Sequence, residues 1–596
     1  MKSCDLPLAN LDEVPRQRSW KTPILVSIAW GCLLSLYVCR VFFRLEYGEF
    51  FENHDGDSYG VRLIEFRDCL AHGFWLPQWC SHFRGGLGAP FFSYYQPLFF
   101  YVASLTPSSW PVAHQLGATV SVFSVVGYLG ILWLVSHRFG VAAGTLAATF
   151  LLTAPYIHTE LYIRGDLSEY AAMMLVPGLL AALLQFCEQP SRPIGIVGAL
   201  LAASVVMTHP AVALVTYGLI ACWLIAIAVV QRNWLGTLRG FALLALGVGL
   251  SAVYWLPVFL ESQYSSVEKM WNGTVFDGYY HYSRHFVSLP SLVNSAVTET
   301  PIPVKLGSYQ TVIAVVGALM AFWKWTRWSH HQRHTTGLCL FLLSAGLFLM
   351  IPQSAFLWAV LPLMGRIQFP WRLLTLVSLA MAGVAGIGWG AFSERRWNWL
   401  GLVVLCGLLL GSTAARSNPK LTKQNEPRNA SEIVDRFFAP DLADEWLPKG
   451  AENIQFDPKT LQPRTNHEAR LRNYQMQTGV LECHLETTQE TAVVLPHYFF
   501  STGFVAMLGR QQIDLHRTAR GLMQVDVPAG FSGTLRVEWQ TSPAKWKGLA
   551  VSLLTVIGGM WLMRYVKNPA GSSRESLSQQ HQIEHEYSDA NDFRAT

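Results

Sequence analysis

A chain of 596 residues that is 51% hydrophobic and only 14% charged, with a mean hydropathy of +0.27, is too apolar for a set of soluble domains. The composition predicts a protein that crosses a membrane many times and keeps some mass outside the bilayer. The net charge of +5 is small, and the basic residues lie in short groups between apolar runs, so no nucleic-acid partner is expected.

The first predicted element is a transmembrane helix at about 23–43. Residues 1–22 before it are polar and basic, and no small-residue cleavage site follows it. We therefore expect an uncleaved span and a cytoplasmic N-terminus. Further apolar runs bring the expected total to about twelve transmembrane helices. These runs lie at about 113–136, 140–157, 169–187, 194–208, 211–230, 240–259, 308–324, 336–351, 371–391, 397–413 and 547–564.

The loop at 45–112, the first to leave the membrane, is unusually rich in ionisable groups. It opens with an acidic cluster and continues into an aromatic segment, 91–106, that is punctuated by Pro90 and Pro97. If 91–106 does not cross, the Lys and Arg groups of the later loops all fall on the cytoplasmic side, as the positive-inside rule requires. We therefore expect this segment to be interfacial or re-entrant.

A polar insert at about 414–546 separates the predicted transmembrane region of 23–413 from the last predicted span, and it is expected on the outer face. After an irregular start it shows alternating apolar runs separated by turn residues. This pattern predicts a small antiparallel β domain in the form of a sandwich. The runs lie at 479–486, 491–497, 504–508, 522–527 and 534–539. The last span leads to a polar cytoplasmic tail, 565–596, whose composition predicts disorder.

The ten cysteines are scattered and form no CxxC pair, so most of them are expected to be small core residues. Cys69 and Cys80 share the first loop, where a disulfide between them is one option.

Asp55 and Asp57 form the first candidate site. Two carboxylates two residues apart, with Gly56 allowing a tight turn, can bind a divalent cation or supply a general base without metal. Arg62 follows at helical spacing, so the turn is expected to begin a helix. The plain alternative is a solvated turn.

Two further stretches on the outer face carry arginines. Arg164 lies between apolar residues at a predicted helix end, where it could clamp a phosphate or reach outward to lipid head groups. Asp166 and Glu169 after it have the spacing of an N-cap and its capping-box partner. Arg366 and Arg372 flank a helix start, which suits an anionic head group or simple anchoring at the interface. His209-Pro210 indicates a structural break.

The residues of the first loop resemble a known family. The pattern is Asp55-x3-Tyr59-x2-Arg62-x10-Gly73-x3-Pro77, followed by Gly85-x2-Gly88-x-Pro90-x3-Tyr94-x2-Pro97-Leu98. With Arg164-Gly-Asp166, Gln368-Phe-Pro-Trp-Arg372 and the end of the β domain at 498–539, it is similar to a bacterial membrane protein family named "6-pyruvoyl-tetrahydropterin synthase-related". That family is akin to YfhO-like proteins and to the GT-C class of glycosyltransferases. Nothing in the sequence indicates pterin chemistry.

The resemblance implies a GT-C-like fold and a sugar transferase. In GT-C enzymes the first external loop carries an acidic residue, and a polyprenyl-phosphate sugar is the donor. Carried over, the acidic position falls on Asp55. Tyr59 stands where the family often has His, which removes a metal ligand.

These observations together predict an inverting transferase. Asp55 would deprotonate the acceptor hydroxyl, and Asp57 would assist it or hold a divalent cation, the cofactor that the sequence leaves open. Arg164 with Arg366 or Arg372 would stabilise the departing lipid phosphate. The full set of candidate substrate-binding residues is His54, Tyr59, Arg62, Arg164, Asp166, Glu169, Arg366 and Arg372.

The expected partners are a polyprenyl-phosphate-linked sugar, membrane lipid and an acceptor in the cell envelope, which could be a glycan, a lipid or a protein. The expected location is the bacterial inner membrane, with the active face outside the cytoplasm. One rival is a non-catalytic scaffold or export component whose β domain binds a surface polymer. A transporter is a third option, although the predicted spans are poor in Asp, Glu and Lys.

Overall fold

The structure of the chain is a computed structural model that describes most of the sequence. The described residues are 21–46, 48–270, 278–294, 297, 299–300, 302–361, 363–392, 398–414, 419–423, 428–436, 446–451 and 462–566. Almost all of the predicted N-terminal segment, 1–22, and of the predicted tail, 565–596, lies outside these ranges.

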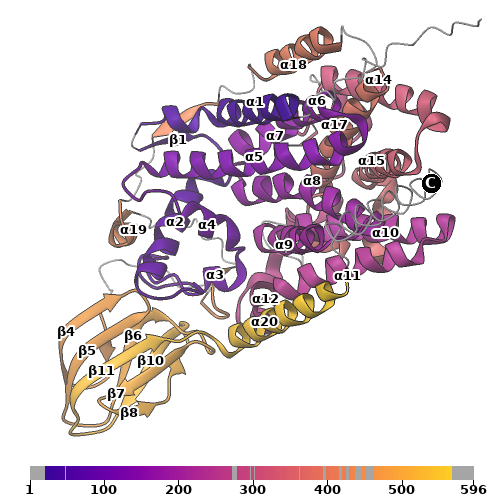
Figure 1. The fold of residues 1–596 in the computed structure, drawn as a ribbon. Coiled ribbons are helices and arrows are strands. Elements are labelled where there is room, and N and C mark those ends of the chain that lie inside the picture. The colour runs from indigo at the N-terminus through magenta and orange to yellow at the C-terminus, as the bar shows by residue number, and fades with distance from the viewer. Residues whose placement is uncertain are drawn as a thin grey trace, which may run out of the picture.

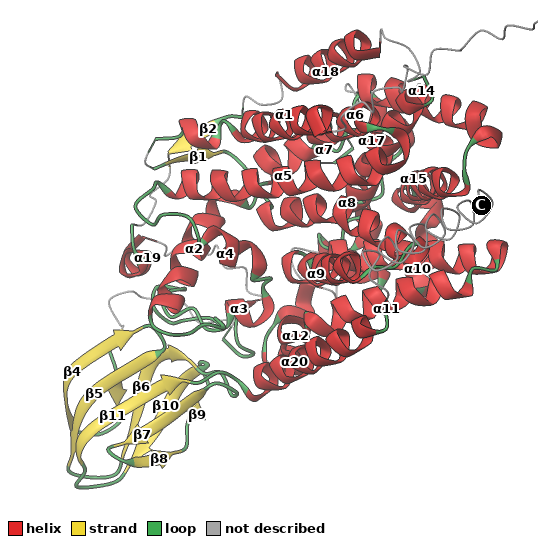
Figure 2. Cartoon of the chain, in the orientation of Figure 1, coloured by secondary structure: helices red, strands yellow, loops and turns green. Residues whose placement is uncertain are grey.

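A bundle of long apolar helices makes up the body of the protein (Figures 1 and 2). By length and composition, seven of the described helices can cross a membrane, or up to nine when each of two bent pairs counts as one span. Every predicted span falls on a helix or a bent pair, while the number of crossings stays a prediction. The helices are α1 Lys21–Cys39, α5 Val112–Phe139, α6 Val141–Leu152, α8 Leu167–Glu188, α9 Arg192–Thr208, α10 Pro210–Gln231, α11 Trp234–Leu250, α12 Ala252–Glu261, α14 Ser308–Lys324, α15 His330–Met350, α17 Leu374–Gly390, α18 Asn398–Ala414 and α20 Pro543–Arg564.

Helices α8 and α17 lie at the centre of the bundle, and 89% of the apolar stretch in each is buried. Helix α8 packs tightly against α5 because glycines meet at the crossing. A Cβ added to Gly130 would lie 2.5 Å from the backbone nitrogen of Gly178. Such small-residue contacts let helices in a membrane approach closely and gain van der Waals packing.

One of the bent pairs ends in an unusual turn. Helix α6 is followed by α7 Pro155–His158 and by a π-helix, η2 Thr159–Arg164, with a bend of 44° between the two parts. Pro155 has no backbone N–H, so it favours a break in the helix. π-Helical turns are rare and often occur at functional sites.

The first loop is folded back against the bundle. It contains β1 Glu49–Phe51, α2 Gly56–Ala71, α3 Phe91–Tyr94 and α4 Leu98–Ala103. Helices α3 and α4 have only four and six residues, which is too short to cross a bilayer and agrees with the prediction that 91–106 does not span. Most of their aromatic side chains are buried within the protein, with Phe91, Phe92, Phe99 and Phe100 fully enclosed.

The end of the insert forms a small β domain that α20 connects to the bundle (Figure 1). Two sheets, with strand orders β3-β6-β10-β9 and β4-β5-β11-β7-β8, enclose a separate hydrophobic core. The expected fold class, a helical membrane protein with a small β domain before its last helix, is confirmed. The strands are β3 Arg464–Thr465, β4 Ala469–Gln477, β5 Val480–Thr487, β6 Thr491–Tyr498, β7 Phe504–Leu508, β8 Gln511–Ile513, β9 His516–Arg517, β10 Leu522–Val527 and β11 Ser532–Trp539.

The insert is tied to the first loop at both of its ends. Near its start, β2 Leu421–Lys423 pairs with β1, and α19 Ala430–Arg436 contacts α2. In the β domain, His497 Nε2 accepts a hydrogen bond of 2.9 Å from the indole of Trp79. Nearby, Cys69 and Cys80 are both buried and free, so the disulfide considered above is not formed.

The remaining described helices are short connections. They are η1 Phe42–Arg44, η3 Ser262–Tyr264, η4 Val267–Met270, η6 Tyr282–Arg284, α13 Leu289–Val293, η7 Trp325–Arg327, η8 Pro352–Ser354, α16 Ala355–Val360, η9 Met364–Ile367 and η10 Pro370–Leu373.

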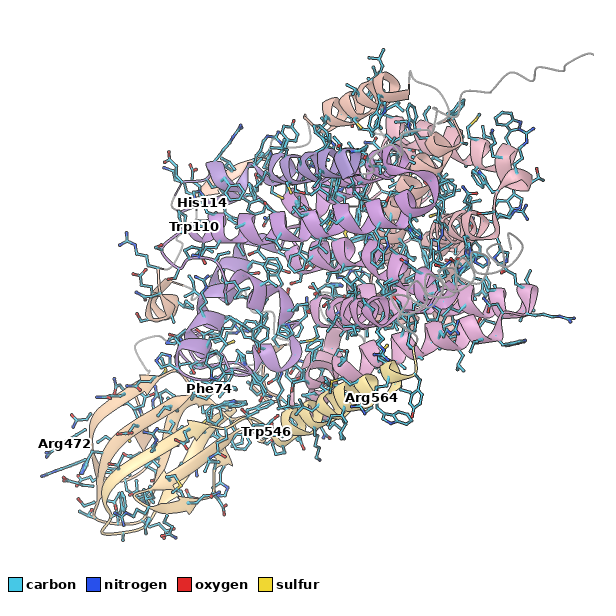
Figure 3. The ribbon with its side chains drawn as sticks, viewed as in Figure 1. Phe74, Trp110, His114, Arg472, Trp546 and Arg564 are labelled. Carbon is cyan, nitrogen blue, oxygen red and sulfur yellow. The ribbon has the colours of Figure 1, made fainter. Side chains whose placement is uncertain are left out.

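The orientation of the chain in the membrane can be tested by cysteine labelling. Arg472 lies on the β domain and points away from the helices (Figure 3), whereas His330 is exposed at the start of α15. We expect a membrane-impermeant maleimide to label Arg472→Cys in intact cells and His330→Cys only after permeabilisation, because the positive-inside rule places them on opposite sides. The parent chain is the control, and the reverse labelling pattern would contradict the predicted orientation.

Candidate active site

A cavity of about 490 Å³ lies where the first loop meets the helix ends of the bundle. Its wall combines ionisable groups with eight aromatic side chains. Seven of the ten residues selected from the sequence line it, and their roles stay predictions. These seven are His54, Asp55, Arg62, Arg164, Asp166, Arg366 and Arg372.

The other three residues selected from the sequence are not among the described residues that line the cavity. Tyr59 and Glu169 are fully buried behind the cavity wall and contact residues that line it. Asp57 lies in the first turn of α2, but its side chain is outside the described part of the structure.

Asp55 keeps its carboxylate available to the cavity. It occupies the N-cap position of α2 without making a side-chain cap hydrogen bond. Asn53 caps this turn instead, because its Oδ1 accepts a hydrogen bond of 2.9 Å from the backbone of Gly56. The side chain of Asp55 therefore lines the cavity rather than serving the helix.

The backbone fixes the position of Asp55 against the end of the π-helix. The N–H of His54 donates to the carbonyl of Ile163 at 3.2 Å, and the N–H of Asp55 donates to the carbonyl of Arg164 at 2.9 Å. Gly165 allows this close approach because its φ is +73° and a Cβ there would lie 2.6 Å from the nitrogen of Gly56.

Replacing Gly165 with alanine is expected to lower stability by at least ~1–3 kcal/mol, since the backbone strain is joined by a collision with the turn that carries Asp55. Gly73→Ala is a matched control, because Gly73 also has positive φ, +85°, but has nothing within 4 Å of the added Cβ. Thermal unfolding of both variants in detergent checks this. Equal losses would show that the contact with Gly56 is unimportant.

Arg164 belongs to a buried ion cluster and is only 4% exposed. Its guanidinium pairs with Glu160 at 3.0 Å, with Asp166 at 3.2 Å and with Glu169. The alternative in which Arg164 reaches outward to lipid head groups is therefore wrong. The phosphate-clamp hypothesis needs revision as well, because three carboxylates already share this guanidinium.

Arg372 extends the same cluster from a distant part of the chain. Its Nε donates to Glu169 at 2.9 Å, and its Nη1 donates to the carbonyl of Ile367 at 2.8 Å and to Oε1 of Gln368 at 3.0 Å. Arg366 lines the cavity as an exposed residue. The three arginines thus border one cavity, and acidic partners hold Arg164 and Arg372 in place.

A chain of hydrogen bonds joins the first loop to Asp166. Arg62 donates to the hydroxyl of Tyr95 at 3.0 Å, this hydroxyl lies 3.0 Å from that of Tyr59, and Tyr59 donates to Asp166 at 2.8 Å. Burial raises the pKa of Tyr95 to about 12 and raises the pKa of Tyr59 well above its ordinary value, so both remain protonated donors. Tyr59 therefore anchors Asp166.

The two aspartates of the cavity differ in their acidity. Burial and the neighbouring charge of Asp166 raise the pKa of Asp55. Burial also acts to raise the pKa of Asp166, but the nearby His209 and the charge of Arg164 outweigh it and bring this pKa well below its usual range. Asp55 is thus the better proton acceptor, whereas Asp166 stays ionised.

Asp166 accepts a hydrogen bond from the backbone of Glu169 at 3.0 Å, which confirms it as the N-cap of α8. The carboxylate of Glu169 does not complete a capping box, since it pairs with Arg164 and Arg372.

His209 is the main site residue that the sequence reading missed. Its Nε2 lies 3.7 Å from Asp166 and 3.6 Å from Glu169. These three side chains could hold a metal ion, which differs from the expected pair of Asp55 and Asp57. However, His209 Nδ1 accepts a hydrogen bond from Val212, so in the neutral ring Nε2 carries the proton and cannot bind a cation. The arrangement fits a hydrogen-bonded ion cluster better than a metal centre.

Two further site residues, Glu160 and Gln368, were assigned no role from the sequence. A buried glutamate four residues before Arg164 has the helical spacing of an ion pair, and this signal could have identified Glu160. No comparable local signal identifies Gln368, which lines the cavity and binds Arg372.

The chain is similar to one sequence family. Residues 92–422 match the family described as "6-pyruvoyl-tetrahydropterin synthase related domain; membrane protein", which confirms the family expected from the sequence. None of the curated proteins matches the chain.

Three solved structures show a distant likeness. The mycobacterial arabinofuranosyltransferase AftD is 16% identical with a TM-score of 0.40, over 67% of this chain and 26% of AftD. ArnT from Cupriavidus metallidurans, bound to undecaprenyl phosphate, is 15% identical with a TM-score of 0.38, over 70% of both chains. The Archaeoglobus fulgidus oligosaccharyltransferase is 12% identical with a TM-score of 0.43, over 74% of this chain and 58% of the other. This chain thus spans about a quarter of the length of AftD.

Proposed function

This chain belongs to the 6-pyruvoyl-tetrahydropterin synthase-related family of membrane proteins, and we propose that it is a membrane glycosyltransferase. In this proposal a sugar moves from a polyprenyl-phosphate donor to an acceptor in the cell envelope. The observation that carries the proposal is the cavity of about 490 Å³, which brings a carboxylate of raised pKa together with guanidinium and aromatic groups at the ends of apolar helices.

Asp55 is the proposed general base. Its carboxylate lines the cavity, and its raised pKa makes it a stronger proton acceptor than an ordinary aspartate. It would take the proton from the acceptor hydroxyl as that oxygen attacks the anomeric carbon and the bond to the lipid phosphate breaks. Inversion at the anomeric carbon follows from a single displacement of this kind.

The leaving phosphate is the group that needs positive charge. Arg366 and Arg62 line the cavity, and we assign them to the phosphate before Arg164 or Arg372, because carboxylates already hold these two guanidinium groups. Arg164 and Arg372 are proposed instead to shape the wall, because their carboxylate partners hold them in place. The aromatic side chains of the wall would pack against the sugar and the first isoprene units.

The expected location in the bacterial inner membrane, with the cavity open to the outer side, is part of the same proposal. It follows from the positive-inside rule applied to the helices. An acceptor in the cell envelope would reach the cavity from that side, and the lipid-linked donor would reach it from the bilayer.

A transfer assay tests the proposal. Purified protein in detergent is incubated with a panel of undecaprenyl-phosphate-linked sugars and an envelope extract, with and without EDTA. We expect release of undecaprenyl phosphate with one sugar, and no release from the same panel by Asp55→Asn protein. Equal transfer activity with and without EDTA would indicate that the reaction needs no divalent cation. Absence of transfer with every donor would favour the non-catalytic scaffold.

A further inference from the structure

Gln368 is a buried polar residue of the cavity whose hydrogen-bonding needs are not met. Its side chain lines the cavity and is 6% exposed. Its Oε1 accepts from Nη1 of Arg372 at 3.0 Å, but its Nε2 has no hydrogen-bond partner among the described residues. Buried polar atoms in native proteins are nearly always paired, so an unpaired amide donor beside a cavity calls for an explanation.

The orientation of this amide is dictated by its neighbour. Arginine has five N–H donors and no acceptor, so the side of Gln368 that meets Arg372 must be its carbonyl oxygen. Turning the amide over would place donor against donor. The NH2 group is therefore the part of Gln368 that remains for a ligand.

The backbone at Gln368 is held in a strained conformation. Its φ is +66° and its ψ is −51°, and the N–H of Phe369 donates to the carbonyl of Ile367 at 2.7 Å. These values define a γ-turn with positive φ at its centre, which is rare for any residue other than glycine. Strain of this kind persists where surrounding contacts enforce it, and it concentrates at ligand sites.

The surroundings enforce this conformation from both sides. The ring of Phe369 stacks on Trp371 with centroids 4.9 Å apart, and Arg372 donates to the carbonyl of Ile367 at 2.8 Å. The turn therefore presents one defined group, the NH2 of Gln368, from a rigid wall.

The polar side chains that residues 366–372 bring to the cavity offer donors, whereas the carboxylates of Asp55 and Asp166 belong to other parts of the cavity wall. Arg366 and Arg372 can only donate, and the oxygen of Gln368 is already used by Arg372. Donors of this kind suit a ligand group that can only accept hydrogen bonds. A sugar hydroxyl both donates and accepts, whereas a phosphate anion only accepts. Phosphate oxygens accept from neutral as well as charged donors.

We propose that Nε2 of Gln368 is a phosphate-binding donor that holds one oxygen of the ligand's phosphate in this cavity. The inference rests on the proposed function for the identity of the ligand, a lipid-linked phosphate. A free phosphate offers the same oxygens, so both sources are tested. Gln368 thereby adds a neutral donor to the positive charge of Arg366.

The competing explanation is that Gln368 only orients Arg372. Gln368→Glu separates the two roles, because glutamate keeps an oxygen for Arg372 but offers the ligand a second carboxylate oxygen in place of NH2. If Gln368 only positions Arg372, this variant preserves binding. If its NH2 holds phosphate, the variant folds and loses binding, since two negatively charged acceptors then face each other.

Two further variants complete the design. Gln368→Gly removes the amide and relieves the positive-φ strain, so we expect a thermal unfolding midpoint equal to or above that of the wild type together with weaker binding. Gln96→Glu is the matched control for charge, because Gln96 is also buried in the cavity wall but lies outside the 366–372 segment.

The experiment measures binding of undecaprenyl phosphate, and separately of inorganic phosphate, to each full-length variant in detergent by calorimetry. We expect about tenfold weaker binding for Gln368→Gly and up to about a hundredfold for Gln368→Glu, with a much smaller change for Gln96→Glu. Binding of the lipid alone identifies a lipid source, and binding of both identifies the phosphate group itself.

Either of two results would overturn the inference while leaving the proposed function intact. One is wild-type affinity in Gln368→Glu, whatever Gln368→Gly shows, and the other is an equal loss in Gln96→Glu and Gln368→Glu. A wild-type protein that binds neither phosphate would overturn the inference and the proposed function together.

Discussion

Replacing Asp55 with asparagine is expected to reduce the rate of sugar transfer by a factor of about 10²–10⁴, the usual contribution of a general base. Asparagine has nearly the same shape but cannot accept the proton of the acceptor hydroxyl. The position of the turn should not change, because the backbone of Asp55 bonds to Arg164 and the capping is done by Asn53. The measurement is kcat/KM with the active donor found in the panel.

Stability provides the control for this variant. Because burial and the charge of Asp166 raise the pKa of Asp55, its charged form is less stable in the folded protein than in the unfolded chain at neutral pH. Removing the charge should therefore leave the thermal unfolding midpoint unchanged or higher. A variant that loses activity by unfolding would show the opposite shift, and full activity would rule out Asp55 as the base.

The same raised pKa fixes the direction of the pH dependence. A base works in its deprotonated form, so activity rises with pH through the pKa of Asp55 and is lost below it. The acid limb of kcat/KM should lie above the ordinary aspartate value of about 4. A limb at or below this value would contradict the assignment.

Much of the fold could be predicted from the sequence because its signals are local. Runs of apolar residues predicted the helices. Alternation of apolar and polar residues predicted five strands, whose expected boundaries are close to those of β5, β6, β7, β10 and β11. Strand β4 was missed, and its alternation is interrupted by a register shift between Arg472 and Gln475. Strand β2 has only three residues, and it pairs with β1 although most of the helical bundle separates the two strands in the sequence.

The site could be predicted only in part. Asp55, Arg164 and Arg372 were conspicuous because ionisable residues are rare beside apolar segments. Their partners were not, because the pairing of Arg372 with Glu169 joins residues 203 positions apart. A sequence shows charges one at a time, so it suggested a free phosphate clamp where the fold has an ion cluster. The proposed role of Gln368 could not be predicted for the same reason, since it depends on the contact with Arg372 and on a strained turn.

Replacing Arg164 with glutamine is expected to destabilise the protein by about 3–5 kcal/mol, because it leaves buried carboxylates without their shared cation. Glu160, Asp166 and Glu169 all pair with this guanidinium. Arg372 can still form an ion pair with Glu169, but no other described arginine or lysine lies within ion-pair distance of Glu160. Thermal unfolding in detergent, followed by tryptophan fluorescence, measures the loss.

A surface arginine with similar contacts is the matched control. Arg536 in the β domain pairs with Glu482 at 2.9 Å and with Glu538 at 3.0 Å, but all three side chains are partly exposed. Arg536→Gln should cost no more than about 1 kcal/mol, because water screens these charges. The contrast between the two variants therefore measures burial rather than the number of ion pairs.

A second substitution identifies the cause of the loss at Arg164. If unpaired negative charge is responsible, Glu160→Gln added to Arg164→Gln should recover part of the stability, since one buried carboxylate is then neutral. Lipid-phosphate binding separates this role from the clamp suggested by the sequence. If Arg164→Gln protein unfolds at the wild-type temperature but no longer binds undecaprenyl phosphate, the result supports Arg164 as a phosphate clamp. If it is less stable but still binds the lipid at low temperature, the result supports an ion cluster that holds the wall of the cavity.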